Sequence, residues 1–260
     1  MIAADERNTV QNGVVFMRGL GRLITVAGAA ATVAVMSPGL ASASPGGPAV
    51  PGITLVSPIA SGYAAVPKPG GADFIHVQST YVVPQVNCTM TPNGVAQTRA
   101  GLDGISDNTV ERVGISEACK NGAASYTAWY QMFPAMGSPA PTFHPSPGDK
   151  VTASVTADAG IYTLSVHDLT SGKSFTVTKA CASCLNSSAE VTAGSPPGKP
   201  PADFNVVHFA GIAVTDGGGV SGGLANPAWN TVTLTQSGSP HTVAGPLPSP
   251  YTAFADTWAP

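Results

Sequence analysis

The sequence predicts an all-β protein, an antiparallel β-sandwich, from three observations. Short runs rich in β-branched and aromatic residues recur along the 260-residue chain, and turns containing Gly or Pro separate them. The run from Ile161 to Asp168 alternates between apolar and polar side chains, as a half-buried strand does. No amphipathic pattern of ordinary helix length is present. Many short strands with turn signals between them favour two sheets packed face to face.

Residues 1–43 are expected to form a secretory signal peptide. Arg18 and Arg22 precede an apolar run over 23–36, and Ala41-Ser42-Ala43 has the A-x-A form of a signal-peptidase site. The apolar run is too short for a comfortable bilayer-spanning helix, so no stable membrane insertion is expected after cleavage. The protein is therefore expected to be secreted.

Residues 44–72 are expected to be a linker or a propeptide remnant, because they are rich in Pro, Gly, Ala and Ser and lack a sustained period. The folded domain is then expected over 73–260, which is enough chain for one two-layer core. Whether translation starts at Met1 or Met17 stays open.

Strands are expected over the following runs: 77–83, 110–116, 125–133, 150–156, 161–168, 174–179, 204–214 and 231–236. The segment 169–173, Leu-Thr-Ser-Gly-Lys, has the composition of a hairpin turn between two of these strands.

The predicted mature chain is sparsely charged. Loss of residues 1–43 leaves eight basic and twelve acidic side chains, and the remaining Glu residues are Glu111, Glu117 and Glu190. Nucleic-acid binding would need clustered Lys and Arg, so no nucleic-acid partner is expected. The protein is expected to be a monomer.

Four cysteines in an exported chain indicate disulfides, which are expected to pair Cys88 with Cys119 and Cys181 with Cys184. Cys181-Ala-Ser-Cys184 could alternatively be a redox motif or half of a zinc site. A zinc site needs a second pair of ligands, and a thioredoxin-type motif belongs in a βαβ context, which the sequence lacks. The five His residues show no ligand spacing, so neither a metal nor a cofactor is expected.

Two blocks of residues carry the strongest functional signal. The first contains Gly101-Leu102-Asp103-Gly104, Arg112-Val113-Gly114 and the strand Tyr126-Thr127-Ala128-Trp129-Tyr130-Gln131, closed by a Pro at 134. The second contains Ser188-Ala189-Glu190-Val191, a Pro/Gly-rich loop and Ala202-Asp203-Phe204. In content and order these blocks resemble the eqolisins, the glutamic peptidases.

The resemblance implies two curved, packed antiparallel sheets of lectin-like architecture, with the site on a concave face. It also implies an endopeptidase for protein or peptide substrates, active at acidic pH, in which Glu190 is the general base for water attack. Arg112 stands where the family has its catalytic Gln, whose amide donates a hydrogen bond to the developing oxyanion. Glu190 and Arg112 are expected on neighbouring strands, with their side chains converging in one groove.

The arginine at 112 decides between functions. It keeps hydrogen-bond donors but adds a permanent charge, and an ion pair with Glu190 is expected to lower the pKa of that carboxyl and weaken the base. Val191 also replaces the family's Trp. A weakly active endopeptidase, a peptide-binding pseudoenzyme and, less favoured, a carbohydrate-binding sandwich all stay open, since fold alone does not set function.

Asp103, Trp129, Tyr130 and Gln131 are further candidates for substrate binding. Asp103 either orients a site residue or serves the turn chemistry of its Gly-flanked position. Trp129 and Tyr130 are adjacent on a strand and face opposite ways, so one is expected in the core and the other in the groove. Gln131 either supplies an amide beside Arg112 or is a structural strand residue.

Overall fold

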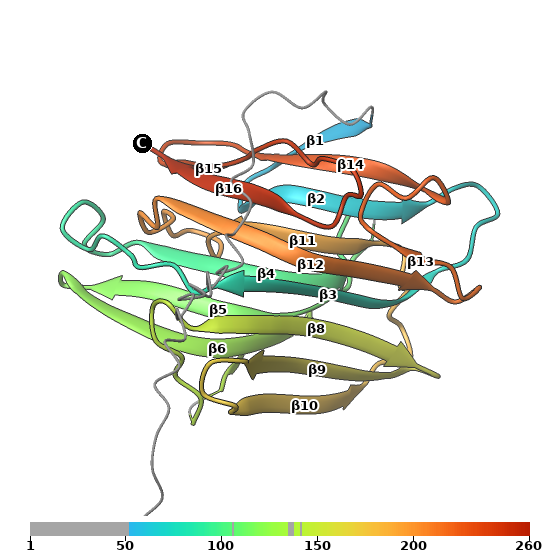
Figure 1. Cartoon of the computed structure of the whole chain (residues 1–260), viewed down its shortest axis with the longest axis horizontal. Coiled ribbons are helices and arrows are strands. Elements are labelled where there is room, and N and C mark those ends of the chain that lie inside the picture. Colours follow the sequence, from blue (N-terminus) through green and yellow to red (C-terminus); the bar gives the residue numbers. More distant parts are fainter. Residues whose placement is uncertain (1–51, 106, 135–137, 141) are drawn as a thin grey trace, which may run out of the picture. The chain divides into compact units, whose positions relative to one another are not determined.

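A computed structural model describes residues 52–105, 107–134, 138–140 and 142–260. The chain forms a sandwich of two sheets, as expected, and no helix occurs in these residues (Figure 1). The predicted signal peptide lies outside the described part of the chain. Within that part, no helix is long and apolar enough to cross a membrane.

The first sheet contains, in spatial order, β1 (Ile53–Ser57), β14 (Trp229–Gln236), β2 (Ala60–Pro67), β11 (Ala189–Gly194), β4 (Val95–Asp103), β5 (Val110–Lys120), β6 (Ala123–Phe133) and β7 (Ser138–Pro139). The second contains β10 (Ser174–Ala180), β9 (Ile161–Asp168), β8 (Lys150–Asp158), β3 (Phe74–Val82), β12 (Val206–Asp216), β16 (Phe254–Ala259) and β15 (His241–Ala244), with β13 (Ser221–Gly222) paired to β12. The strands pair antiparallel except that β1 runs parallel to β14.

The core lies between the sheets because alternate residues of each strand point the same way. On β5 these are Val113 and Ile115, and on β9 Leu164 and Val166, all fully buried. An aromatic contact joins the two layers at one end, where the ring of Tyr63 on β2 meets that of Phe254 edge-on at 5.0 Å. The opposite face of the first sheet is thereby left for the site.

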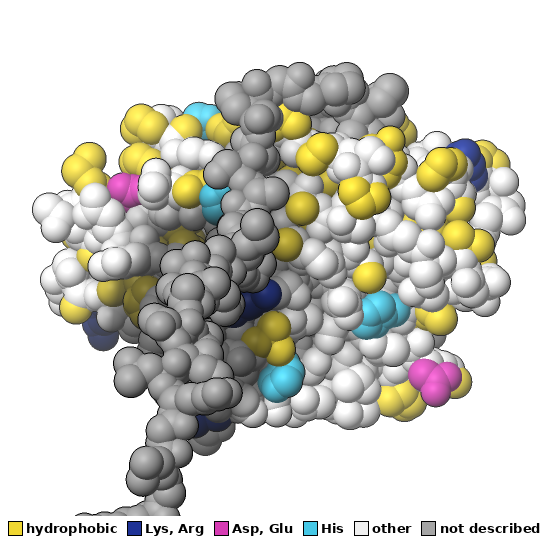
Figure 2. Space-filling view, viewed as in Figure 1, with side chains coloured by type: hydrophobic (Ala, Val, Ile, Leu, Met, Phe, Trp, Pro, Cys, Tyr) yellow, Lys and Arg dark blue, Asp and Glu magenta, His cyan; other side chains and the backbone are white. Residues whose placement is uncertain are grey.

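Figure 2 shows few charged side chains on the outer face of the second sheet. Hydroxyl groups pair across its strands, Thr80 with Thr152 at 2.8 Å and Ser154 with Ser165 at 2.9 Å. These hydrogen bonds between neutral hydroxyl groups agree with the sparse charge of the chain.

The expected linker is wrong for Ile53–Ser57 and Ala60–Pro67, which form β1 and β2. Six of the eight residues of β2 are buried, because it lies between β14 and β11. Its small residues serve close packing: a Cβ added to Gly62 would come within 2.4 Å of the Val191 carbonyl oxygen. The first strand of the sandwich therefore begins at Ile53, twenty residues before the predicted start at residue 73.

Candidate active site

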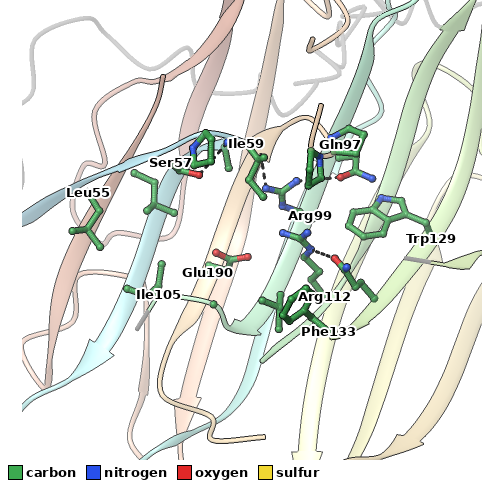
Figure 3. A pocket seen from close by; sticks show the side chains of 18 of the residues that line it. Leu55, Ser57, Ile59, Gln97, Arg99, Ile105, Arg112, Trp129, Phe133 and Glu190 are labelled. Atoms are coloured by element: carbon green, nitrogen blue, oxygen red, sulfur yellow. Dashed lines mark hydrogen bonds between the residues drawn. The ribbon is translucent and has the colours of Figure 1, made fainter. Parts of the chain in front are cut away.

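A pocket of about 800 Å³ opens on the face of the first sheet that points away from the second. Strands β4, β5, β6 and β11 form its floor, and residues 55–60 with the β4–β5 loop form a wall (Figure 3). Its lining includes Leu55, Ile59, Gln97, Arg99, Ile105, Asp107, Arg112, Trp129, Gln131, Phe133, Glu190 and Leu234.

The strand register sets four residues side by side across the floor. Glu190 is opposite Gly101, Gly101 is opposite Arg112, and Arg112 is opposite Gln131. Glu190 and Arg112 do converge on one pocket, but β4 lies between their strands, so the expectation of neighbouring strands is wrong.

Gly101 provides the space between the two candidate catalytic residues. A Cβ at this position would lie 2.9 Å from Cβ of Arg112 and 3.3 Å from Oε1 of Glu190. The Glu190 carboxyl thus reaches over the glycine toward Arg112, and any side chain at 101 would crowd both residues.

Arg112 is held by two neighbours on β6. Its Nε donates a hydrogen bond of 2.8 Å to Oε1 of Gln131, and its guanidinium carbon lies 5.6 Å from the ring centre of Trp129. These contacts agree with placing both residues in the groove, and they aim the terminal nitrogens of Arg112 into the pocket (Figure 3).

Glu190 faces the arginines without touching them. It is 6 % exposed, and its carboxyl forms neither a hydrogen bond nor an ion pair within 4.0 Å to any residue of the described segments. The expected ion pair with Arg112 is therefore absent. Burial raises the pKa of Glu190, and although the charges of Arg99 and Arg112 act to lower that pKa, burial outweighs them.

Arg99 is a site residue that the sequence analysis missed. It precedes Gly101 by two residues on β4, so its side chain points to the same face, and its guanidinium lies beside that of Arg112 (Figure 3). The signal that could have found it is compositional, because Arg99 and Arg112 are the two arginines between residues 44 and 260.

The structure does not bring Asp103 or Tyr130 into the pocket. Asp103 is fully buried, and its carboxylate accepts hydrogen bonds from the backbone N–H groups of Leu185, Asn186 and Ser187. Tyr130 faces the other side of its strand, where its ring stacks on Phe175 at 6.0 Å. Asp103 thus fixes a loop, while Trp129, and not Tyr130, lines the groove.

Both expected disulfides are present, Cys88–Cys119 and Cys181–Cys184. Glu111 lies beside the second, with its Oε1 2.8 Å from Sγ of Cys184. A disulfide sulfur can only accept a hydrogen bond, so the carboxyl must donate in its protonated form, and burial raises the pKa of Glu111 to about 9. Since both sulfurs are covalently bound to each other, these three residues do not make a metal site in the part of the chain that is described.

Comparisons with known proteins support the family and the fold of this chain. The Peptidase A4 family model matches residues 59–245. Scytalido-glutamic peptidase in complex with a transition state analog inhibitor is 19 % identical with a TM-score of 0.65, over 78 % of this chain and 99 % of that one. Aspergilloglutamic peptidase from Aspergillus niger is 21 % identical with a TM-score of 0.55, over 64 % and 99 %.

A further solved structure is SCP-B, a member of the eqolisin family, in complex with the tripeptide Ala-Ile-His. It is 19 % identical, with a TM-score of 0.53, over 77 % of this chain and 98 % of that one. No curated protein sequence matches the chain. At these identities the solved structures establish a shared fold.

Proposed function

Because the chain belongs to the Peptidase A4 family, we propose that it hydrolyses peptide bonds as a glutamic-type endopeptidase, with Glu190 as the general base. The observation that carries the proposal is the Glu190 carboxyl. It is buried, lacks a protein partner among the described residues and faces two guanidinium groups across a pocket large enough for a peptide segment.

Each residue of the floor then has a chemical role. Glu190 takes a proton from a water molecule as the water oxygen attacks the scissile carbonyl carbon. The terminal N–H groups of Arg112 donate to the oxygen that becomes negative, while Gln131 and Trp129 keep the guanidinium in place. The proton on Glu190 passes to the leaving amine when the C–N bond breaks.

The pH dependence follows from the ionisation of Glu190. The base must be ionised, so activity is lost as the pH falls through its pKa. Burial sets that pKa above the ordinary value for a glutamate. The acid limb of the profile is therefore expected at a higher pH than an exposed carboxyl would give.

Peptide binding without hydrolysis is the second candidate, and the two arginines favour it. Their positive charges favour the ionised carboxylate of Glu190 and so oppose its uptake of a proton from water, although burial holds its pKa above the ordinary value. In this alternative the pocket holds the peptide, but the water is not activated.

We also propose that the protein acts outside the cell as a monomer on protein or peptide substrates. The extracellular location is supported by the signal-like features of residues 1–43 and by the two disulfides. Sequencing the N-terminus of protein from the culture medium tests it, and a terminus upstream of the apolar run 23–36 would contradict it.

The activity is tested with internally quenched peptides between pH 2 and 7. Glu190→Gln is expected to remove hydrolysis, and Arg112→Met to lower kcat/KM by a factor on the order of 10² to 10³, because an oxyanion donor is lost. Arg112→Gln, which keeps a donor, is expected to stay within about tenfold of wild type.

Two results would contradict this proposal. Undiminished hydrolysis by Glu190→Gln would show that another group is the base. Binding of the same peptides by the wild type without cleavage at any pH would establish the peptide-binding alternative.

A further inference from the structure

Arg99 is a buried cation without a matching anion. It is 1 % exposed, and the two hydrogen bonds that its guanidinium donates are long. Nη1 lies 3.3 Å from Oε1 of Gln97, and Nη2 lies 3.5 Å from the Ile59 carbonyl oxygen. Its Nε has no hydrogen-bond partner, and within the described segments no carboxylate oxygen lies within 4.0 Å of the guanidinium.

Three carboxyls surround Arg99 at longer range, those of Glu190 in the pocket and of Glu117 and Asp256 in the core behind it. Burial raises the pKa of Glu117 to about 8 and that of Asp256 to about 7, and it raises the pKa of Glu190 as well. At acidic pH Glu117 and Asp256 are therefore largely protonated and do not balance the charge of Arg99, which stays protonated as arginines do. The carboxyl of Glu190 lies more than 4.0 Å from the guanidinium and does not pair with it.

A buried, unpaired guanidinium is costly to a protein unless a ligand pairs with it. Arg112 adds a second positive charge beside the first, so the pocket brings together both arginines of residues 44–260. The fork of an Arg matches a carboxylate and can bind it through two parallel hydrogen bonds.

We propose that Arg99 binds a carboxylate of the peptide substrate, which makes this site selective for peptides that carry an acidic group close to the scissile bond. The proposal rests on the proposed function, since it takes the occupant of the pocket to be a peptide. The carboxylate is either the free C-terminus or the side chain of an Asp or Glu.

The strand spacing sets how close the acidic group must be. Arg99 and Gly101 are two residues apart on β4, which is about 7 Å, and Glu190 lies over Gly101. An extended peptide spans this distance with about two residues. The carboxylate is therefore expected one or two residues from the bond that is cut, between the apolar wall at Ile59 and the floor.

Direct binding tests the proposal without relying on catalysis. The protein is the full mature chain with Glu190→Gln, and the probes are fluorescent hexapeptides of small apolar residues that end in a free carboxylate or in a carboxamide. A second pair of C-terminally amidated hexapeptides carries either an internal Glu or an internal Gln. Fluorescence anisotropy at pH 5 gives each Kd.

One acidic peptide of the two pairs is expected to bind about 10- to 100-fold more tightly than its neutral partner, as hydrogen bonds to charged groups predict. The pair that shows the preference identifies the source of the carboxylate. Arg99→Met, which fills the same volume without charge, is expected to abolish the preference, and so is Arg99→Gln, the second variant should the first fail to fold. Lys150→Gln removes an exposed cation of the second sheet and is expected to change nothing.

Equal affinity within both pairs, or a preference that survives both Arg99 variants, would overturn the proposal. Hydrolysis by the wild type is measured separately on the same peptides. Cleavage without an acidic preference contradicts only the role of Arg99, whereas a preference without cleavage contradicts only the catalytic proposal.

Discussion

Replacing Glu117 with Gln is expected to change how the stability of this protein depends on pH. Glu117 lies on β5, fully buried between the sheets. Its Oε1 accepts a hydrogen bond of 2.7 Å from the Thr98 hydroxyl, and its Oε2 has no partner. A carboxyl in this setting keeps its proton, and burial raises its pKa to about 8.

The magnitude follows from the difference between the folded and the unfolded chain. The unfolded carboxyl titrates near its ordinary pKa of 4.5 and the folded one near 8. At about 1.4 kcal/mol per pH unit, the free energy of unfolding contributed by this group falls by on the order of 5 kcal/mol. The contribution is complete below about pH 4.5 and is lost as the pH rises to about 8, because the folded state holds the proton more tightly.

Urea unfolding between pH 4.5 and 8.5 measures this effect. The wild type is expected to lose stability steadily as the pH rises, and Glu117→Gln, which has the same shape and no titrating group, is expected to lose several kcal/mol less. Part of the slope remains in the variant, because burial also raises the pKa of Glu111 to about 9 and that of Asp256 to about 7. Asp158→Asn, at the exposed last residue of β8, is the matched control.

An identical pH dependence in the wild type and in Glu117→Gln would refute this reasoning. It would mean that the folded and unfolded chains bind the Glu117 proton equally well, which a carboxyl buried between two sheets cannot do.

The other predictions concern the site and the loop beside it. Gly101→Ala is expected to lower peptide affinity and to cost about 1–3 kcal/mol in urea unfolding by crowding the pocket floor; an unchanged Kd would contradict this. Asp103→Ala is expected to lower the free energy of unfolding by about 3 kcal/mol or more, because three backbone N–H groups that donate hydrogen bonds to its carboxylate lose their acceptor. Trp129→Ala is expected to raise the Kd for peptides and Tyr130→Phe to leave it unchanged, as anisotropy titrations can show; equal effects would contradict their opposite orientations.

The alternation of side chains was enough to predict the sandwich and eight of its strands, because period-two patterns depend on short-range geometry. The family resemblance carried by the two motif blocks likewise implied that Glu190 and Arg112 converge in one groove, and both line the pocket. The sequence could not decide which of Trp129 and Tyr130 faces the groove. Adjacent strand residues point to opposite faces, but the pattern does not say which face is which.

What escaped prediction depends on contacts between distant parts of the chain. Strand β2 has the Gly and Ala content of a linker, and it becomes a central strand because small residues let β11 and β14 approach closely. Arg99 was missed because the sequence pattern did not predict strand β4, on which Arg99 and Gly101 point to the same face. Asp103 does not line the pocket, because the chain after Cys184 folds over it and donates three backbone N–H hydrogen bonds to its carboxylate.

The position of β2 restricts how this protein can mature. A zymogen that became active by releasing residues 44–72 would give up β1 and β2, leaving the edges of β11 and β14 open to pairing with other chains. It would also lose residues 55–60, which wall the pocket. Removal of the predicted leader, which ends at residue 43, would spare both strands. N-terminal trimming that keeps the sandwich and the pocket wall intact is therefore expected to stop before Ile53.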